Sequence, residues 1–360
     1  MSGEKRNGRL FELAERLTHT GNLSDQEFTV ILESDDPEID KYLGEKARIV
    51  REKYYGKEVY LRGLIEFTSF CRNNCFYCGI RRDNRNAERY RLTEEEIISC
   101  SDKGYKLGFR TFVLQGGEDP YFTDERLLPI IMEIKARYPD CAITLSLGER
   151  ETESYLRLFE AGADRYLLRH ETADKDHYGR LHPKEMIFEN RMKCLKDLKK
   201  IGYQVGCGMM VGSPYQRTEH LVKDIRFIQK LQPEMVGIGP FIPHHETVFA
   251  KCEPGTVRMT LRLLSLIRLV LPEVLLPATT ALGTVDSFGR EKGLLAGANV
   301  VMPNLSPTEV RGKYLLYDNK ICTGDEAAEC IRCMRTRVSK VGYHVIESRG
   351  DHPSFKPGYK

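Results

Sequence analysis

The 360-residue sequence lacks several features that would place it in a large class of proteins at once. It has no apolar run approaching the roughly 18 residues needed to cross a membrane. Its first nine residues are charged and precede an amphipathic stretch, so the apolar core of a signal peptide is missing. Neither sign of charge dominates, because 55 Lys and Arg face 52 Asp and Glu, and no long basic or basic-aromatic stripe occurs. We expect a cytoplasmic protein that binds neither membrane nor nucleic acid.

Cysteine, in contrast, is frequent, with 11 residues. In a cytoplasmic chain such thiols stay reduced, which argues against a disulfide framework and favours metal binding. Six of the 11 form two triads, one at residues 71–78 and one at residues 322–333. The other five are scattered, and we expect them to be small buried apolar side chains.

The first triad is Cys71, Cys75 and Cys78, directly after the apolar segment 64–67. Iron-sulfur clusters are normally held by four cysteines, so three thiolates can bind a 4Fe-4S cluster and leave one iron open for chemistry. A structural zinc ion is the alternative, and it would need a fourth ligand from a remote part of the chain. We favour the cluster.

The second triad, Cys322, Cys330 and Cys333, lies near the C-terminus. Three thiolates again suit an iron-sulfur cluster, either 2Fe-2S or 4Fe-4S, while a zinc ion or an empty site is the alternative. Nothing in the surrounding sequence resembles a substrate pocket. We therefore expect a surface site that does not carry the main chemistry.

Short apolar runs and longer amphipathic segments alternate from residue 60 onward. The eight runs are 60–67, 111–115, 142–147, 165–169, 204–211, 235–239, 275–280 and 299–302. Eight alternating units predict an α/β protein with a complete (β/α)8 TIM-type barrel, and an open sheet or a six-unit partial barrel is the alternative. We expect an N-terminal helical extension at 1–55, the barrel at 56–310 and a C-terminal extension at 311–360.

Glycines and ionisable side chains follow the predicted strands. Gly116, Gly117 and Glu118 come after the second run, and Arg169-His170-Glu171 ends the fourth. The active site of a parallel barrel lies at the carboxyl ends of its strands, and the first cysteine triad falls on the same rim. Carboxylates accept hydrogen bonds from ammonium groups or hydroxyls, and an arginine fork binds a carboxylate. A salt-bridge network that only stabilises the rim is the alternative.

The Cys-x3-Cys-x2-Cys spacing resembles the signature of the radical S-adenosylmethionine (SAM) superfamily. Longer segments resemble the HydE family of FeFe-hydrogenase maturases, in the group of that superfamily that also contains biotin synthase and methylornithine synthase. These segments are 67–84, 113–121, 144–149, 161–172, 235–244, 277–283 and 297–304. Together they cover most of the chain, from about residue 50 to 335.

This resemblance implies an enzyme that reductively cleaves SAM to a 5'-deoxyadenosyl radical. It implies a role in assembling the two-iron subcluster of the hydrogenase active site, on a cysteine-bound iron complex that carries carbon monoxide and cyanide. The implied partners are the sister maturases HydG and HydF and an electron donor such as ferredoxin or flavodoxin.

The resemblance also implies roles for individual residues. The cluster ligands would be Cys71, Cys75 and Cys78. The SAM-binding residues would be Tyr77, Gly116, Gly117, Glu118, Ser146, Glu171 and Arg191. The residues acting on the substrate in the inner cavity would be Gln115, Arg169, Thr279, Thr280 and Tyr317. The second triad, Cys322, Cys330 and Cys333, matches an accessory-cluster site that only some family members have.

Three other readings remain open. One is a methylornithine synthase, and another is a biotin-synthase-like sulfur inserter, which would need several cysteines facing the barrel interior. Only Cys207 lies plainly within a predicted strand. The third is a non-catalytic iron-sulfur carrier, which would consume no SAM.

Overall fold

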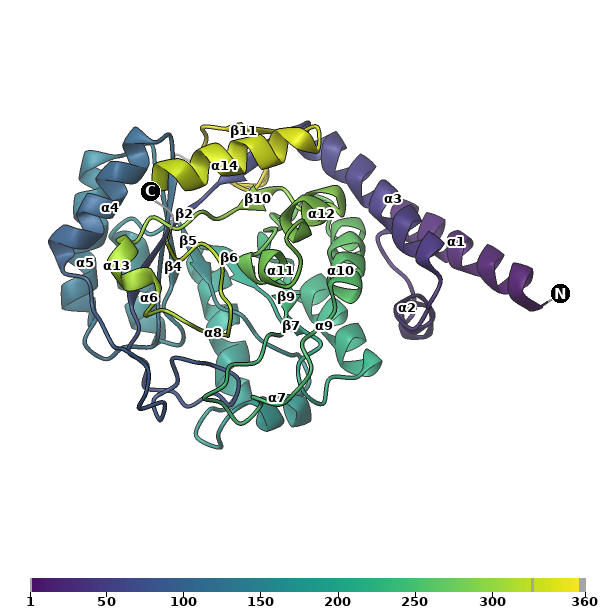
Figure 1. Cartoon of the computed structure of the whole chain (residues 1–360), viewed down its shortest axis with the longest axis horizontal. Helices are drawn as coiled ribbons and strands as arrows, with labels where there is room; N and C mark the ends of the chain where they lie inside the picture. The colour runs from purple at the N-terminus through teal and green to yellow at the C-terminus, as the bar shows by residue number, and fades with distance from the viewer. Residues whose placement is uncertain (1, 325–326, 356–360) are drawn as a thin grey trace.

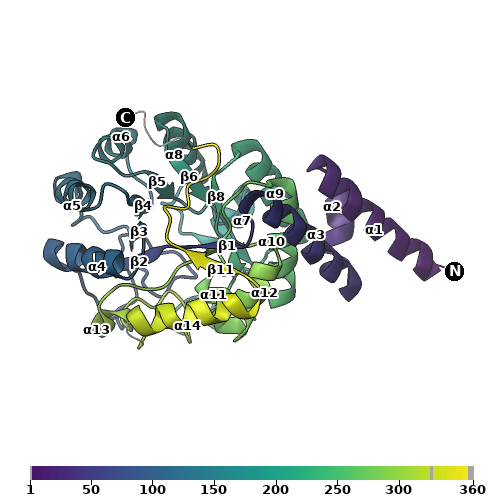
Figure 2. The same cartoon turned by 90° about the horizontal axis from the view of Figure 1, so that it is seen from above.

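The computed structural model describes residues 2–324 and 327–355, with the backbone alone at 2–7 and 327–330. Three helices precede the first strand, namely α1 (Ser2–Thr20), α2 (Asp25–Leu32) and α3 (Pro37–Tyr55). Ser24 and Glu27 form a capping box at the start of α2, and Pro37 occupies the first turn of α3 after the cap Asp36. α3 packs on α10 (Val257–Val270), α1 contacts α3 and α10, and α2 contacts α9 (Thr218–Leu231), while the N-terminal end of α1 projects outward (Figures 1 and 2).

Parallel strands form the centre of the molecule. One sheet has the order β2 (Gly63–Thr68), β3 (Thr111–Gly116), β4 (Ala142–Ser146), β5 (Arg165–Leu167), β6 (Gln204–Cys207) and β8 (Met235–Val236). Single parallel bridges continue the pairing from Met235 to Leu275, from Pro277 to Val300 of β10 (Val300–Val301), and from Asn304 to Leu64. Because Leu64 belongs to β2, the pairings of the described residues close a ring of eight segments. The predicted barrel is confirmed.

Helices cover the outside of this barrel (Figures 1 and 2). Their bounds are α4 (Glu94–Lys106), α5 (Asp124–Arg137), α6 (Thr152–Glu160), α7 (Lys175–Leu181), α8 (Phe188–Ile201), α9 (Thr218–Leu231), α11 (Thr280–Val285) and α12 (Gly289–Leu295). Strand side chains are therefore buried on both faces, as all six residues of β2 are. The described chain contains no helix that is both long enough and apolar enough for a membrane span.

The first predicted apolar run, 60–67, forms two strands instead of one. β1 (Glu58–Leu61) pairs with β10 and with β11 (His344–Ile346), whereas β2 begins at Gly63 and pairs with β3. The pairing partner of the chain changes at Arg62, so the predicted single strand is divided into two at this residue. Two short strands, β7 (Met210–Val211) and β9 (Gly239–Pro240), pair beyond the ends of β6 and β8. After β10 come α13 (Thr308–Arg311), at the end of the predicted barrel region, and α14 (Ala327–Lys340), in the C-terminal extension.

Candidate active site

A cavity of about 370 Å³ lies at the carboxyl ends of the barrel strands. Its wall comes from the cysteine loop (71–78), the turns after β3 to β5, and the C-terminal segment 314–322. The residues predicted to bind the first cluster, SAM and the substrate all line this cavity. They are Cys71, Cys75, Cys78, Tyr77, Gly116, Gly117, Glu118, Ser146, Glu171, Arg191, Gln115, Arg169, Thr279, Thr280 and Tyr317. The fold thus brings together positions 246 residues apart in the chain.

Arg89 holds the cysteine loop in shape. Its guanidinium donates to the carbonyl oxygens of Ser69, of Ile80 at 2.8 Å, of Arg81 at 2.7 Å and of Asn84 at 3.1 Å. A planar fork with five donors can join several carbonyls that no helix or strand organises. Arg89 cannot be singled out in the sequence, because residues 72–91 contain six arginines and only the folded loop distinguishes them.

The three thiols lie close enough to affect one another. Burial raises the pKa of Cys78 to about 12, and the neighbouring thiol of Cys71 adds to the rise. Burial and the other two thiols raise the pKa of Cys75 as well. Three thiolates at this place therefore need positive charge between them, which the irons of a cluster provide. The loop fits a 4Fe-4S cluster held by Cys71, Cys75 and Cys78.

A preformed zinc site is not found at this loop. Among the described residues, three ligand atoms of His, Cys, Asp or Glu approach within 4.8 Å of one another at His244, His245 and Asp318. There the backbone N–H of His245 donates to Asp318 at 2.8 Å, Nδ1 of His245 lies 2.7 Å from the same carboxylate, and the backbone N–H of Glu246 donates to Nδ1 of His244 at 3.1 Å. Hydrogen bonding accounts for this group without a metal.

Glu118 and Arg191 lie beside the cysteine loop. Glu118 follows the end of β3, and Arg191 lies in the first turn of α8. Glu118 accepts from the backbone N–H of Glu149 at 3.0 Å and from the guanidinium of Arg72 at 3.2 Å. Arg191 donates to Glu149 at 2.5 Å and to the carbonyl of Arg169 at 2.7 Å. Burial alone would lower the pKa of Arg191, but Tyr178, Glu149 and Glu118 outweigh it and hold the guanidinium charged. Acidic and basic groups thus alternate along this wall.

Glu171 has a backbone conformation that fixes its carboxylate. Its φ is 63°, in the left-handed region that side chains other than glycine seldom adopt. Its N–H donates to the carbonyl of Gly208 at 3.0 Å, and its carboxylate lies 3.2 Å from Arg169. Strain of this kind concentrates where a side chain must be held in one position for function.

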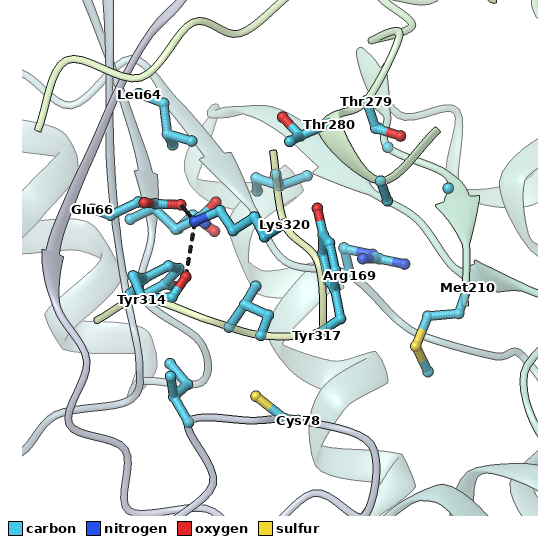
Figure 3. Close-up of a pocket in the computed structure, with 18 of the residues that line it drawn as sticks. Leu64, Glu66, Cys78, Arg169, Met210, Thr279, Thr280, Tyr314, Tyr317 and Lys320 are labelled. Atoms are coloured by element: carbon cyan, nitrogen blue, oxygen red, sulfur yellow. Dashed lines mark hydrogen bonds and ion pairs between the residues drawn. The ribbon is translucent and has the colours of Figure 1, made fainter. Parts of the chain in front are cut away.

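Arg169, Tyr317, Thr279 and Thr280 surround the inner part of the cavity (Figure 3). The Nε of Arg169 is buried without a hydrogen-bond partner among the described residues. Burial raises the pKa of Tyr317 to about 12, so its hydroxyl keeps its proton. The cavity therefore offers donors to a ligand that carries negative charge.

The same cavity contains an ion pair that was not predicted from the sequence. Lys320 and Glu66 lie 2.6 Å apart and both line the cavity (Figure 3). For Glu66 one feature of the sequence indicates a special role, namely a charged residue within the apolar run 64–67. For Lys320 no such feature exists, because it lies 254 positions from its partner in the chain.

The second cysteine triad is not wholly a surface site as expected. Cys333 is exposed on α14, but Cys322 lines the cavity and Arg290 donates to its sulfur at 3.6 and 3.7 Å. The Cys330 side chain lies outside the described residues. The extension reaches the cavity through the segment 314–322, which the sequence could not show.

The inward cysteines needed by a biotin-synthase-like enzyme are not found among the described residues. Cys207 on β6 is fully buried and is not part of the cavity wall, whose cysteines are Cys71, Cys75, Cys78 and Cys322. A second cluster inside the barrel would have no thiol ligands from the strands.

Comparison with known proteins agrees with this geometry. Residues 65–228 match the model of the radical SAM superfamily. The FeFe hydrogenase maturase subunit HydE of Thermotoga maritima is 47% identical over 293 residues, which cover 81% of this chain and 83% of that protein. The 3-methylornithine synthase of Methanosarcina acetivorans is 29% identical over 81% of this chain and 82% of its own length.

A solved structure of methylornithine synthase (PylB) superposes with a TM-score of 0.81 at 27% identity, over 92% of this chain and 97% of that one. The methylornithine synthase therefore shares this fold, while the sequence identity is much higher to the maturase than to the synthase. With its cysteine loop, its cavity and this identity over four fifths of its length, the chain belongs to the HydE family within the radical SAM superfamily.

Proposed function

We propose that this chain takes part in building the two-iron subcluster of FeFe hydrogenase, acting on a small cysteine-bound iron complex that carries carbon monoxide and cyanide. The observation that supports this most is that the cysteine loop faces a donor-lined inner space within one cavity. The 47% identity to a hydrogenase maturase subunit supports the same assignment.

The chain is a radical SAM enzyme, so its cofactors are a 4Fe-4S cluster and SAM. When bound and reduced, the cluster supplies the electron that cleaves SAM to a 5'-deoxyadenosyl radical. The protein's own part is to hold and orient. Cys71, Cys75 and Cys78 would hold the cluster, and the alternating charges of Glu118, Glu149, Arg191 and Glu171 would hold the ammonium, carboxylate and ribose groups of SAM. Tyr77, Gly116, Gly117 and Ser146 would complete that wall.

The inner residues suit an anionic substrate. Arg169, Thr279, Thr280, Gln115 and Tyr317 present N–H and O–H groups that the barrel fixes in place. Preorganised donors in a site with little water stabilise negative charge without having to reorient. The protonated hydroxyl of Tyr317 can donate throughout the neutral pH range.

The proposed partners are the maturases HydG and HydF and a protein electron donor such as ferredoxin or flavodoxin, in the cytoplasm. The donor would approach the cysteine loop, where Met186 covers the sulfur of Cys75 at 3.5 Å and Arg72 and Arg82 are exposed. A second cluster at Cys322, Cys330 and Cys333 would be accessory, because the catalytic loop already contains three thiols.

The radical chemistry is tested by SAM cleavage. Anaerobically reconstituted protein with dithionite and SAM is expected to release 5'-deoxyadenosine, measured by liquid chromatography. Cys75→Ala removes a cluster ligand and should abolish release. The matched control is Cys252→Ala, which removes a half-buried cysteine outside the cavity wall and should leave the rate unchanged. No deoxyadenosine from well reconstituted protein would support the iron-sulfur carrier instead.

The maturase role is tested in cells that produce FeFe hydrogenase together with HydG and HydF. Without this chain the hydrogenase is expected to be inactive, and its expression should restore hydrogen evolution. The methylornithine synthase reading predicts a different result. Restoration of methylornithine formation from lysine, with no effect on hydrogenase, would replace the proposal with that activity.

A further inference from the structure

The inner cavity contains a buried pair of opposite charges. Glu66 projects from β2, and Lys320 comes from the C-terminal segment 314–322. Their side chains are 2% and 8% exposed, and Nζ lies 2.6 Å from Oε1 of Glu66. Figure 3 shows Lys320 reaching Glu66 and Tyr314 across the space that Arg169, Tyr317 and Thr280 also face.

The pair keeps unused hydrogen-bonding capacity. Lys320 donates to Glu66 and to the carbonyl of Tyr314 at 2.8 Å, which occupies two of the three protons of an ammonium group. Glu66 accepts from Lys320 on one oxygen and from Asn304 at 2.8 Å on the other, although a carboxylate can accept about four hydrogen bonds. One donor and further acceptor sites therefore remain for a molecule in the cavity.

Stability alone does not explain this pair. Removing two charges from water costs several kcal/mol each, and apolar replacement of a buried ion pair is often neutral or stabilising. Leu64, Met302 and Leu316 line the same cavity, so apolar side chains are accommodated there. A charge pair at a ligand cavity is better explained by the ligand.

We propose that Glu66 and Lys320 bind the two charges of an α-amino-acid head group, the ammonium on Glu66 and the carboxylate on Lys320. A simple anion would be repelled by Glu66, and a simple cation by Lys320. In an α-amino acid both charges are attached to one carbon, which matches two protein charges in direct contact. The four charges then alternate in sign. This inference rests on the proposed function in that the cavity is taken as the substrate site.

Three probes that carry the same propyl group test the head group. L-norvaline carries both charges, pentanoate lacks the ammonium and butylamine lacks the carboxylate, and none has a sulfur that could bind iron. Binding is measured by anaerobic titration calorimetry on cluster-loaded protein saturated with SAM, so that the open iron is already occupied. Because each missing charge removes a charge-assisted hydrogen bond, L-norvaline should bind about tenfold or more tightly than either analogue.

Two variants assign the charges. Lys320→Met should lower the affinity for L-norvaline about tenfold and leave that for butylamine unchanged or higher, because Lys320 repels a simple cation. Glu66→Gln should lower the affinity for L-norvaline and leave that for pentanoate unchanged or higher. Lys292→Met removes an exposed lysine of α12 and is the control, with wild-type affinities expected.

Several outcomes would overturn the inference. It would be wrong if the three probes bound with equal affinity, or if L-norvaline showed no saturable binding. It would also be wrong if Lys292→Met lost as much affinity for L-norvaline as Lys320→Met and Glu66→Gln do. The wild-type ranking decides the question even where a variant fails to fold. Deoxyadenosine release is measured on the same preparation: its presence with no head-group preference refutes this inference alone, whereas its absence refutes the proposed function.

Discussion

Asp351 closes the end of the barrel opposite the cysteine loop. Its carboxylate contacts Arg165 at the start of β5 at 2.6 Å, Arg349 at 2.7 Å and Gln204 at the start of β6 at 2.8 Å. The Arg165 side chain is completely buried, so Asp351 supplies the charge that makes its burial tolerable. One side chain thus ties the C-terminal tail to two barrel strands.

Asp351→Asn should destabilise the protein by about 3 kcal/mol, because it leaves Arg165 buried without its counter-charge. Burial raises the pKa of Asp351, but Arg165, Arg349 and Gln204 outweigh it and lower the pKa from 3.8 to about 2. A carboxylate with a lowered pKa contributes stability above its unfolded pKa and loses it as the pH falls. Urea unfolding should therefore show a difference in the free energy of unfolding between wild type and variant. This difference should be constant above about pH 4 and decrease between about pH 4 and pH 2.

The matched control for this change is Asp140→Asn, at an aspartate half exposed beside Arg110. A surface pair of this kind contributes little, so the control should stay within about 0.5 kcal/mol of wild type. A pH-independent gap for Asp351→Asn would mean that packing, not charge, fixes the tail.

The sequence alone was enough to predict the role of residues whose chemistry depends on local spacing. Cys71, Cys75 and Cys78 lie within eight positions, so their chemistry is visible before the chain folds. Glu66 and Lys320 were missed because their meaning comes from a contact across the whole barrel. The same holds for Arg89, whose partners are loop carbonyls that no side-chain pattern reveals.

Among the elements, the turn after β3 and the cysteine loop after β2 touch at Gly117. A Cβ at Gly117 would come within 2.1 Å of the carbonyl oxygen of Phe70 and 2.8 Å of the Cys71 side chain. Asp119 anchors this turn by accepting from Thr68 at 2.7 Å and from the fork of Arg91. The close approach needs glycine at this position.

Gly117→Ala should therefore push the cysteine loop outward. We expect lower iron content after reconstitution and at least a tenfold loss of deoxyadenosine release, with a small change in melting temperature, because the barrel core is untouched. Gly44→Ala is the control: nothing lies within 4 Å of its Cβ position in α3, and alanine favours a helix. If Gly117→Ala kept the wild-type iron content, the close approach of Gly117 to the cysteine loop would not matter for cluster binding, contrary to this prediction.

The order of strands and helices was predictable because apolar runs alternate with amphipathic segments. The break at Arg62 was not, because strand periodicity continues through it and only pairing partners change. Closure of the barrel depends on single bridges such as Pro277 with Val300. The apolar runs 275–280 and 299–302 predicted these two segments, but a run does not show which segment pairs with which. We propose the division at 1–55, 56–310 and 311–360 for the chain as a whole.

For the whole molecule, charge is unevenly distributed. Residues 72–91 contain six arginines and two acidic residues, so this segment has a surplus of four positive charges, whereas the entire chain has a net charge of +3. Arg72 and Arg82 of this segment are more than half exposed, and exposed Lys184 lies close in sequence to Met186, which contacts Cys75. These exposed cations lie next to the cluster loop, where Arg82 also pairs with Asp83 at 3.1 Å and with Glu185 at 3.8 Å. The surplus of positive charge in residues 72–91 would steer an acidic electron-transfer protein to this surface.

Arg82→Glu combined with Lys184→Glu should slow SAM cleavage driven by reduced flavodoxin about fivefold or more at low salt. The same variant should keep the wild-type rate with dithionite, a small reductant that needs no docking surface. Added salt should narrow the difference, since screening acts on exposed charges. Lys292→Glu with Arg335→Glu reverses as many exposed charges on α12 and α14 and should leave both rates unchanged. Equal flavodoxin-driven rates in the two variants would place the docking surface elsewhere.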